Sequence, residues 1–309
     1  MVLIFGFRYL IYLAHQIKIM GFIVKNLECK YKGAPPVLTI DNIDIKSGEI
    51  VFFLGASGVG KSTILETLGL MNNTIFPNHE TEFAYINQSL KSENFLDIWS
   101  KPEAYLADFR KKNLSFIFQS TNLFSTLTAE DNVLLPSMLS GKSLIDSKNV
   151  SRNIFKKIFS KEYKEILNGK KIYEMSGGQR QRLAFVRAIS SDYNVLFADE
   201  PTGNLDWANA NNLMSYLIYD VRQKKSTAII VSHDIPLAVK HADKIIFIDK
   251  RKKADGNFYG FISDSETYKK NTDGDWFNVE VFKKNKNDIM SAHDIESYFK
   301  EKISTQNLE

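Results

Sequence analysis

The chain has 309 residues, of which 44 % are hydrophobic and 25 % are charged, and its formal net charge is +4. These values are typical of an ordinary folded protein, and the small positive charge gives no reason to expect nucleic acid as a partner. The single cysteine, Cys29, excludes an internal disulfide bond and fits a reducing compartment. The sequence has no run of about twenty uncharged apolar residues, so we expect no membrane-spanning helix.

Residues 1–20 form an N-terminal extension, for which the sequence allows two interpretations. Residues 1–14 are very apolar but contain Arg8, and they have neither the basic start nor the small-residue cleavage site of a signal peptide. Two interpretations remain: an interfacial helix lying on a membrane, or a wrongly assigned start, because Met20 directly precedes the first strand-like segment. An intact-mass measurement on natively expressed protein would decide between Met1 and Met20.

The segment after this extension is predicted to be β-rich. Apolar runs bounded by turn residues predict strands at 22–29, 37–40, 43–45 and 50–54. Tyr31 lies just before the first turn. Its ring is placed either to stack on an adenine or to be half-buried at a strand end, and the local residues leave both interpretations open.

A phosphate-binding pattern follows the last of these strands. The pattern GxxxxGK[ST] lies between the run 50–54 and apolar residues at helical spacing from Ile64. Glycines let backbone N–H groups point at a phosphate, and the helix start adds unpaired N–H groups and a positive dipole end. Lys61 is expected to reach the β- and γ-phosphates, and Ser62 to bind Mg²⁺. The loop comprises Gly55, Ala56, Ser57, Gly58, Val59, Gly60, Lys61, Ser62 and Thr63. We therefore predict that the chain binds a nucleoside triphosphate with Mg²⁺.

The middle of the chain is less regular. Residues 72–113 show no sustained period, and a short apolar strand at 116–118 ends at Gln119. A capping threonine, Thr128, with acidic residues in the turn after it marks a helix start. Apolar residues at helical spacing then predict an amphipathic helix over 147–167.

Two further polar motifs follow. The residues Ser176, Gly177, Gly178 and Gln179 lead into a helix, which makes them a second candidate phosphate site. A buried-type strand at 195–198 ends in Asp199 and Glu200, a position suited to holding Mg²⁺ and orienting water. A tight loop ending at Asp206 precedes the next helix.

The remaining strands place polar residues at their tips. Strands are predicted at 227–231, with His233 just beyond it, and at 244–248. Strands that alternate with helices favour a largely parallel α/β sheet, whose ligands lie beyond the carboxyl ends of its strands.

Residues 256–309 form a C-terminal extension. A hairpin of strands at 258–263 and 276–282 is predicted first. A last amphipathic helix carrying Ile295, Phe299 and Ile303 is predicted to follow. We expect the extension to add packing; a regulatory or partner-binding role is the alternative.

Taken together, the motifs of residues 21–255 resemble the nucleotide-binding cassette of ABC ATPases. The phosphate loop, Gln119, the Ser-Gly-Gly-Gln signature, the Asp-Glu pair, the loop Asn204-Leu205-Asp206 and His233 occur in the family's order. The resemblance implies a P-loop NTPase α/β fold with a mainly parallel core sheet, an antiparallel β subdomain and an α-helical subdomain at about 120–189. The C-terminal extension has no counterpart in this resemblance, the stretch before Gln119 is longer than usual, and Met175 replaces the family's usual leucine, a volume-conserving change.

The resemblance also implies how ATP and Mg²⁺ are held. Tyr31 stacks on the adenine, and residues 55–63 wrap the phosphates. Ser62 and Asp199 hold the Mg²⁺, and Gln119 joins them when the site closes. Such positioning and charge neutralisation are what phosphoryl transfer needs.

The catalytic roles come from the same resemblance. Glu200 polarises the attacking water, His233 senses the γ-phosphate, and Lys61 and Gln119 complete the catalytic set. Residues 176–179 contact the nucleotide held by another copy of the chain, with Asp206 counted among the nucleotide-contacting residues. Two copies are therefore expected to sandwich two ATPs head to tail.

The function implied is the ATP-binding and ATP-hydrolysing subunit of a transporter or mechanotransmission complex. Its sequence is similar to the subgroup of lipoprotein-releasing, macrolide-export and cell-division ATPases. A separate membrane permease is expected to dock near Gln119, between Leu123 and Leu135, which would hold the chain in the cytoplasm at the inner face of the membrane. Neither the substrate nor the choice between transport and mechanical signalling follows from these residues.

Two other functions compete. One is a soluble ABC ATPase acting on nucleic acid or ribosomes, against which stand the single cassette and the lack of sustained heptads. The other is a nucleotide-binding regulator without turnover, which the intact Glu200 disfavours.

Overall fold

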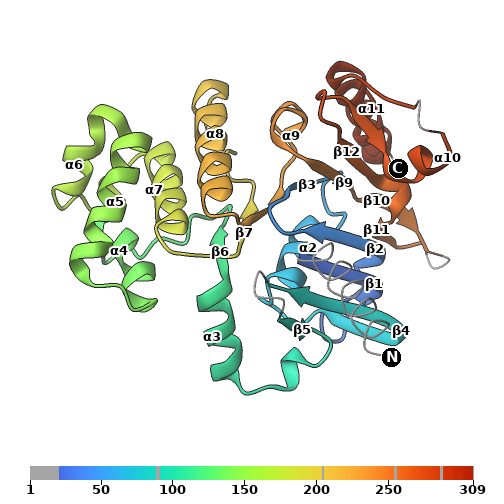
Figure 1. The fold of residues 1–309 in the computed structure, drawn as a ribbon, viewed down its shortest axis with the longest axis horizontal. Coiled ribbons are helices and arrows are strands. Elements are labelled where there is room, and N and C mark those ends of the chain that lie inside the picture. The colour runs from blue at the N-terminus through green and yellow to red at the C-terminus, as the bar shows by residue number, and fades with distance from the viewer. Residues whose placement is uncertain (1–20, 88–90, 204, 254–255, 286–287, 309) are drawn as a thin grey trace, which may run out of the picture.

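The computed structural model describes residues 21–87, 91–203, 205–253, 256–285 and 288–308. The two interpretations of residues 1–20 lie outside the described residues, as does Asn204 of the loop before Asp206. The described chain has three regions: a mostly parallel sheet in the middle, an antiparallel sheet on one side of it and a group of helices on the other (Figure 1).

The core sheet contains seven strands within the described residues. In spatial order these are β13 (Trp276–Asn278), β12 (Thr267–Lys270), β9 (Lys244–Phe247), β3 (Ile50–Leu54), β8 (Thr227–Val231), β7 (Val195–Asp199) and β6 (Leu114–Ile117). The five strands from β9 to β6 pair in parallel, whereas β12 and β13 are antiparallel additions at one edge. Strands β3, β8 and β9 are buried along their whole length, as expected for parallel strands covered on both faces. The predicted core sheet is confirmed.

The second sheet is the predicted antiparallel subdomain. Its order is β10 (Asp249–Lys252), β11 (Phe258–Ile262), β2 (Leu38–Lys46), β1 (Gly21–Cys29), β4 (Ile75–Ile86) and β5 (Ser92–Asn94). All neighbours pair antiparallel except β11 and β2, which are parallel. Strand β4 was not expected, because most of its residues before Phe83 are exposed and carry no alternating pattern.

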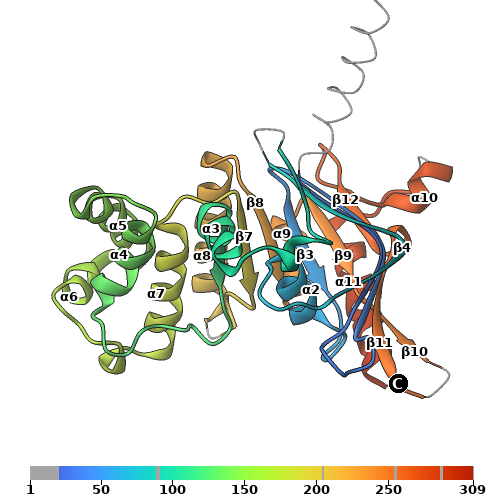
Figure 2. The same ribbon diagram turned by 90° about the horizontal axis from the view of Figure 1, so that it is seen from below.

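The helices divide into two groups. The helical subdomain consists of α4 (Ala129–Leu139), α5 (Leu144–Phe159), α6 (Tyr163–Leu167) and α7 (Gly177–Ile189). Figure 2 shows this group on one side of the molecule and the curved antiparallel sheet on the other. The helices α2 (Lys61–Leu68), α3 (Glu103–Asn113), α8 (Trp207–Gln223), α9 (Ile235–His241), α10 (Val279–Lys284) and α11 (Ala292–Leu308) belong to the rest of the chain. Short 3₁₀ turns occupy Ile98–Ser100, Ser160–Glu162, Ile172–Glu174 and Asp264–Glu266. No helix of the described residues is long and apolar enough to cross a membrane.

The helix predicted over 147–167 is wrong in extent. Helix α5 ends at Phe159, and the short α6 follows after a 3₁₀ turn. The break falls at Ser160, whose φ of 46° is outside the helical region, although the apolar spacing continues across it. Periodicity alone therefore overestimated the helix.

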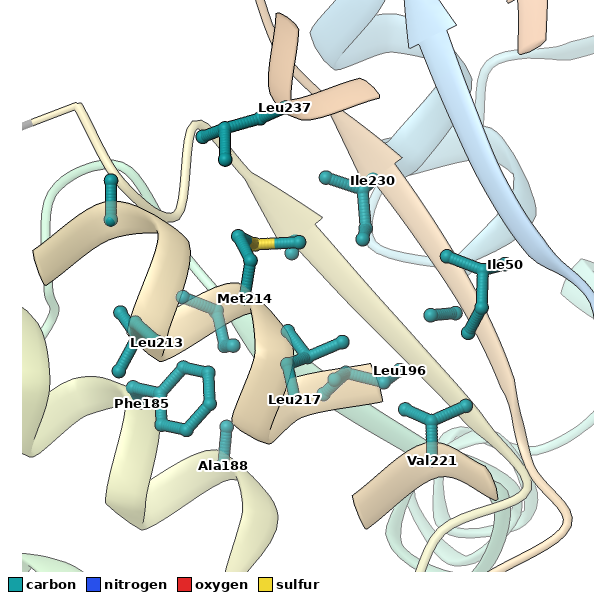
Figure 3. Packing of buried hydrophobic residues seen from close by; sticks show 14 of the residues in the cluster. Ile50, Phe185, Ala188, Leu196, Leu213, Met214, Leu217, Val221, Ile230 and Leu237 are labelled. Carbon is teal, nitrogen blue, oxygen red and sulfur yellow. The ribbon is translucent and has the colours of Figure 1, made fainter. Parts of the chain in front are cut away.

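Two hydrophobic clusters cover the two faces of the core sheet. Alternate residues of β3 divide between them, with Phe52 in one cluster and Phe53 in the other. In the first cluster, Leu217 of α8 lies next to Leu196 of β7, and Leu213 of the same helix lies next to Phe185 of α7 (Figure 3). Each fully buried aliphatic side chain contributes about 1.5–3 kcal/mol. This packing fixes the strand ends from which the site is built.

The predicted hairpin of 258–263 and 276–282 is wrong. Strand β11 lies between β10 and β2 in the antiparallel sheet, whereas β13 pairs with β12 in the core sheet. Residues after Asn278 form α10, because the Asn278 side chain caps a helix there. The predicted final helix is confirmed as α11, with Ile295 and Phe299 fully buried.

Candidate nucleotide site

The predicted strand–loop–helix unit is present as β3, the loop from Gly55 to Gly60, and α2. Gly58 and Gly60 have φ of 77° and 94°, values that favour glycine. A β-carbon at Gly55 would lie 2.9 Å from the carbonyl oxygen of Ile248, so a larger residue would push the loop away from β9. Among the described residues no side chain caps the start of α2. Its first N–H groups therefore remain available to an anion.

Lys61 lies across the mouth of this loop. Its Nζ donates hydrogen bonds to the carbonyl oxygens of Gly55 (2.9 Å) and Ala56 (2.7 Å). Burial lowers the pKa of Lys61, and the nearby carboxylates of Glu200 and Asp199 oppose that shift. Phosphate oxygens would form shorter and stronger charge-assisted bonds with this ammonium group than neutral carbonyls do.

Asp199 ends β7 and faces the first turn of α2. The Ser62 hydroxyl donates to Oδ2 of Asp199 over a long 3.5 Å. Burial raises the pKa of Asp199, and the charge of Glu200 adds to this rise. A hydroxyl and one carboxylate, with Gln119 lining the same cavity, form an oxygen donor set that suits Mg²⁺, which keeps few protein ligands and takes phosphate oxygens. The described residues contain no cluster of three or more acidic, histidine or cysteine side chains that would hold a metal ion by itself.

Glu200 has an unusual backbone and a defined side-chain partner. Its φ of 46° is in the left-handed region, which costs a non-glycine residue about 1–2 kcal/mol. Its Oε2 lies 2.8 Å from Nδ1 of His233 and also accepts from the backbone N–H of His233 at 3.4 Å. The Glu200 side chain is 12 % exposed, against 72 % for His233. A mostly buried carboxylate thus contacts an exposed imidazole at the edge of the cavity, and the water-orienting role of Glu200 stays a prediction.

Two adjoining cavities open onto the phosphate loop. The first, of about 340 Å³, is lined by loop residues together with Gln119, Asp199 and Glu200. The second, of about 680 Å³, adds Gly55, Ala56 and His233. Both cavities include Lys61. The structure therefore brings together the predicted phosphate loop, metal-binding residues and catalytic residues.

Several lining residues were missed by sequence reasoning. Val37 and Val231 line the first cavity, and Ile235 lines the second. The second cavity is also lined by residues of the C-terminal helix, namely Lys300, Ile303, Ser304 and Asn307. Only the helical spacing of apolar residues hinted at this helix, and nothing in the sequence placed it at the site.

Tyr31 lies beside α2 and not among the lining residues of either cavity. Its hydroxyl donates to Oε2 of Glu66 at 2.7 Å and lies 3.3 Å from Oγ1 of Thr63. Burial raises the pKa of this hydroxyl. The stacking of Tyr31 on adenine stays a prediction.

The signature residues stand apart from both cavities. Ser176 caps α7: its Oγ accepts from the Gln179 N–H at 3.2 Å, and Oε1 of Gln179 accepts from the Ser176 N–H at 3.1 Å. Ser176 and Gly177 are exposed. Asp206 is also outside the cavities and caps α8 by accepting from the Asn209 N–H at 3.0 Å; the hydrogen bonds from Asn209 lower its pKa. Within one copy, the signature does not meet the phosphate loop.

The segment after Gln119 is tied to the signature helix. Arg187 of α7 donates to the carbonyl oxygens of Asn122 (2.6 Å) and Thr121 (2.9 Å). Asn132 of α4 is fully buried and bonds both the N–H and the carbonyl oxygen of Phe124. This loop is therefore attached to both α7 and α4.

A phosphate loop with an acid pair at a neighbouring strand end, on a mainly parallel sheet, defines the chain as a phosphate-loop nucleotide-binding protein. Residues 38–203 match the family model described as ABC transporter. The chain belongs to this family, and the resemblance inferred from its motifs is confirmed.

Relatives and solved structures agree with this assignment. The chain is 34 % identical to the bacitracin export ATP-binding protein BceA of Halalkalibacterium halodurans, over 71 % of this chain and 78 % of that protein. It is 32 % identical to the lipoprotein-releasing system ATP-binding protein LolD of Cytophaga hutchinsonii, over 71 % and 93 %. Its fold matches the dimeric post-hydrolysis structure of the ATP-binding cassette MJ0796 bound to ADP and Pi, with a TM-score of 0.61 and 28 % identity, covering 73 % of this chain and 93 % of that chain. None of these three is named as acting on nucleic acid or ribosomes.

Proposed function

We propose that this chain is the ATP-binding and ATP-hydrolysing subunit of a transporter or mechanotransmission complex, which works as a head-to-tail pair on a separate membrane permease. The observation that carries the proposal is the convergence of Lys61, Ser62, Asp199 and Glu200 on one cavity at the carboxyl edge of the core sheet. Membership of the ABC transporter family supports the coupling of this site to a membrane protein.

The site performs its chemistry by positioning. The N–H groups of the loop and of the first turn of α2 bind the phosphates, and Lys61 exchanges its two carbonyl partners for phosphate oxygens. Ser62, Asp199 and Gln119 would hold a Mg²⁺ ion, which would supply charge neutralisation. Glu200 orients the attacking water, and its contact with His233 at 2.8 Å fixes the position of the carboxylate beside the phosphate loop.

The pairing of two copies follows from the separation of the signature from the phosphate loop. The exposed cap at Ser176 and Gly177 is an anion-binding helix start with no phosphate of its own nearby. In a head-to-tail pair each cap faces the nucleotide bound by the other copy. The dimeric state of the MJ0796 cassette supports this arrangement.

The permease docks on the segment from Leu123 to Leu135 and its surroundings. Phe124 is 51 % exposed in this segment, and the exposed apolar side chains of Met138, Leu139 and Ile145 continue the surface along α4 and into α5. Because Arg187 ties the loop to the signature helix, movement of that helix on pairing moves the docking surface. This contact would hold the subunit at the cytoplasmic face of the membrane. Purification in detergent that yields this chain without a multi-span protein would contradict it.

The test of the ATPase assignment is Glu200→Gln. The variant keeps ATP binding but loses about 10²-fold or more in hydrolysis, the contribution of a positioned acid–base group. It also accumulates as an ATP-bound dimer in light scattering. The control is Glu80→Gln, which changes an exposed carboxylate remote from the cavities and keeps wild-type turnover. Unchanged hydrolysis in Glu200→Gln would refute the assignment, and a wild type that binds ATP without turnover would favour a regulator.

A further inference from the structure

The larger cavity has one wall that no motif predicts. Helix α11 contributes Lys300, Ile303, Ser304 and Asn307, whose spacing of three, four and seven residues puts them on one helix face. The opposite wall is the phosphate loop with Glu200 and His233. The C-terminal extension therefore reaches the place where hydrolysis is proposed to occur.

The other face of α11 fastens it to the two sheets. The Phe299 ring stacks on Phe247 of β9 at 5.7 Å between centroids and meets Tyr268 of β12 edge-on at 5.1 Å. Nε2 of Gln306 donates to Oδ1 of Asp249 of β10 at 2.8 Å. Because these contacts join the middle and the C-terminal part of the helix to strands, α11 forms a wall of the cavity.

The cavity face of α11 is only partly covered by its own copy: Ile303 packs against the first hydrophobic cluster, and the polar residues beside it are exposed. The Lys300 side chain is 58 % exposed, and its ammonium group pairs with Glu296 one turn earlier on the same helix at 2.5 Å. Ser304 and Asn307 are exposed, and Ile303 is half-buried. An apolar side chain flanked by polar ones, beside a cavity, has the character of an interface that a partner completes.

An exposed apolar side chain, Trp207, lies close to the signature in the same chain. A β-carbon at Gly178 would lie 3.5 Å from Cδ2 of Leu205, and Nε2 of Gln181 donates to the carbonyl oxygen of Pro201 at 3.0 Å. The loop before α8 is thereby packed against the start of α7. Trp207, the first residue of α8, is 52 % exposed.

We propose that the cavity face of α11 is a contact surface for a second copy of this chain, and that it receives Trp207 of that copy. The proposal rests on the head-to-tail pair of the proposed function. In that pair the signature of the second copy lies at the phosphate loop. Trp207 of the second copy lies there too, because the loop before α8 is packed against the start of α7. The indole then meets the cavity beside the loop, where Ile235 and Ile303 supply apolar surface. Exposed tryptophans that become buried are frequent anchors of interfaces.

The experiment measures ATP-dependent dimerisation by sedimentation in the full-length Glu200→Gln background. Trp207→Ala and Ile303→Asp each weaken the dimer at least about 10-fold, as expected for an interface anchor and its pocket. The dimer affinity of the double variant falls by less than the product of the two single effects, because the two substitutions remove the same contact. Tyr219→Ala, a residue of α8 that is also 52 % exposed, and Glu301→Ala on α11 are the matched controls and leave dimerisation unchanged.

A second measurement does not depend on destabilising variants. Trp207→Cys and Ser304→Cys in one chain give a dimer with a short bismaleimide when ATP is present and none without ATP. Cys29 does not interfere, since it is buried and burial raises its pKa to about 12. The proposal would be overturned if Trp207→Ala or Ile303→Asp left dimerisation unchanged, or if Ile303→Asp strengthened it. Either result would leave the ATPase assignment intact. A Glu200→Gln parent that stays monomeric with ATP would refute the head-to-tail pair and this surface with it.

Discussion

Gly260 lies on β11, outside every motif, and it sets the position of the phosphate loop. Its N–H donates to the carbonyl oxygen of Val37 at 2.8 Å. A β-carbon at this position would overlap the carbonyl oxygen of Val59, and it would lie 2.9 Å from Cγ2 of Ile248 and from Cδ1 of Leu38. Backbone on one side and core side chains on the other leave no direction in which a methyl group fits.

The substitution Gly260→Ala is therefore expected to displace the loop. Ordinary contact with a β-carbon begins near 3.4 Å, so relief requires Val59 and its neighbours to move. Overpacking of this kind costs about 1–3 kcal/mol, and a displacement on the order of 1 Å in a binding loop costs up to about 10²-fold in function. Because Val59 lies between Gly58 and Gly60, whose N–H groups are proposed to bind the phosphates, we expect ATP affinity to fall on the order of 10- to 100-fold.

The assay is titration with a fluorescent ATP analogue, alongside thermal unfolding of the same samples. Gly141→Ala is the control: Gly141 has a φ of 95° and nothing within 4 Å of a built β-carbon, so the change adds backbone strain alone. The control loses stability, about 1–2 kcal/mol, and keeps its ATP affinity. Wild-type ATP affinity in Gly260→Ala would refute the reasoning that β11 positions the phosphate loop.

Two other predictions concern the loop lysine and a buried histidine. Lys61→Ala should weaken nucleotide binding itself, and unchanged affinity in the same titration would contradict the role of Lys61. The pKa of His241 is lowered to about 4, chiefly by burial and also by Lys240 and Lys270. Since the unfolded imidazole takes up a proton near pH 6.5 and the folded one does not, stability is lost as the pH falls from about 6.5 to about 4. The loss is about 1–2 kcal/mol once the partial exposure of the ring is allowed for. Urea unfolding at pH 7 and pH 5 should show this loss in the wild type and a smaller loss in His241→Gln; equal losses would rule it out.

The site could be predicted where short motifs dictate local geometry. The glycines of the phosphate loop and the apolar runs of β3 and β7 specify strand ends, so Lys61, Asp199 and Glu200 were placed correctly relative to strands and helices. The carboxyl ends of parallel strands lie at the same edge of the sheet, so the polar residues that follow them come together although they are far apart in the sequence. Such a rule needs no knowledge of side-chain packing.

The parts that failed depend on contacts between distant segments. Strand β4 is held along β1 by its backbone, and most of its side chains before Phe83 give no burial pattern. The apolar spacing at Ile295, Phe299 and Ile303 predicted α11 as an amphipathic helix, but it did not indicate which elements the helix covers. In the structure Ile295 and Phe299 are buried, and Ile303 packs against the first cluster while also lining the cavity. Which strand a helix covers is decided by tertiary packing that the pattern does not contain.

The attachment of α11 bears on how the nucleotide site closes. Phe299 packs on Phe247 of β9, which is paired with Leu54 at the start of the phosphate loop, and the Ile248 N–H donates to the Leu54 carbonyl at 2.8 Å. The loop and the helix wall are thus both fixed to β9, and the gap between them is set by the fold of one copy. Because both walls are anchored on β9, we expect the cavity of about 680 Å³ to keep its width within one copy when ATP binds. Water would then be excluded from this cavity only when the surface of a second copy covers it. We therefore expect rapid hydrolysis to require the second copy.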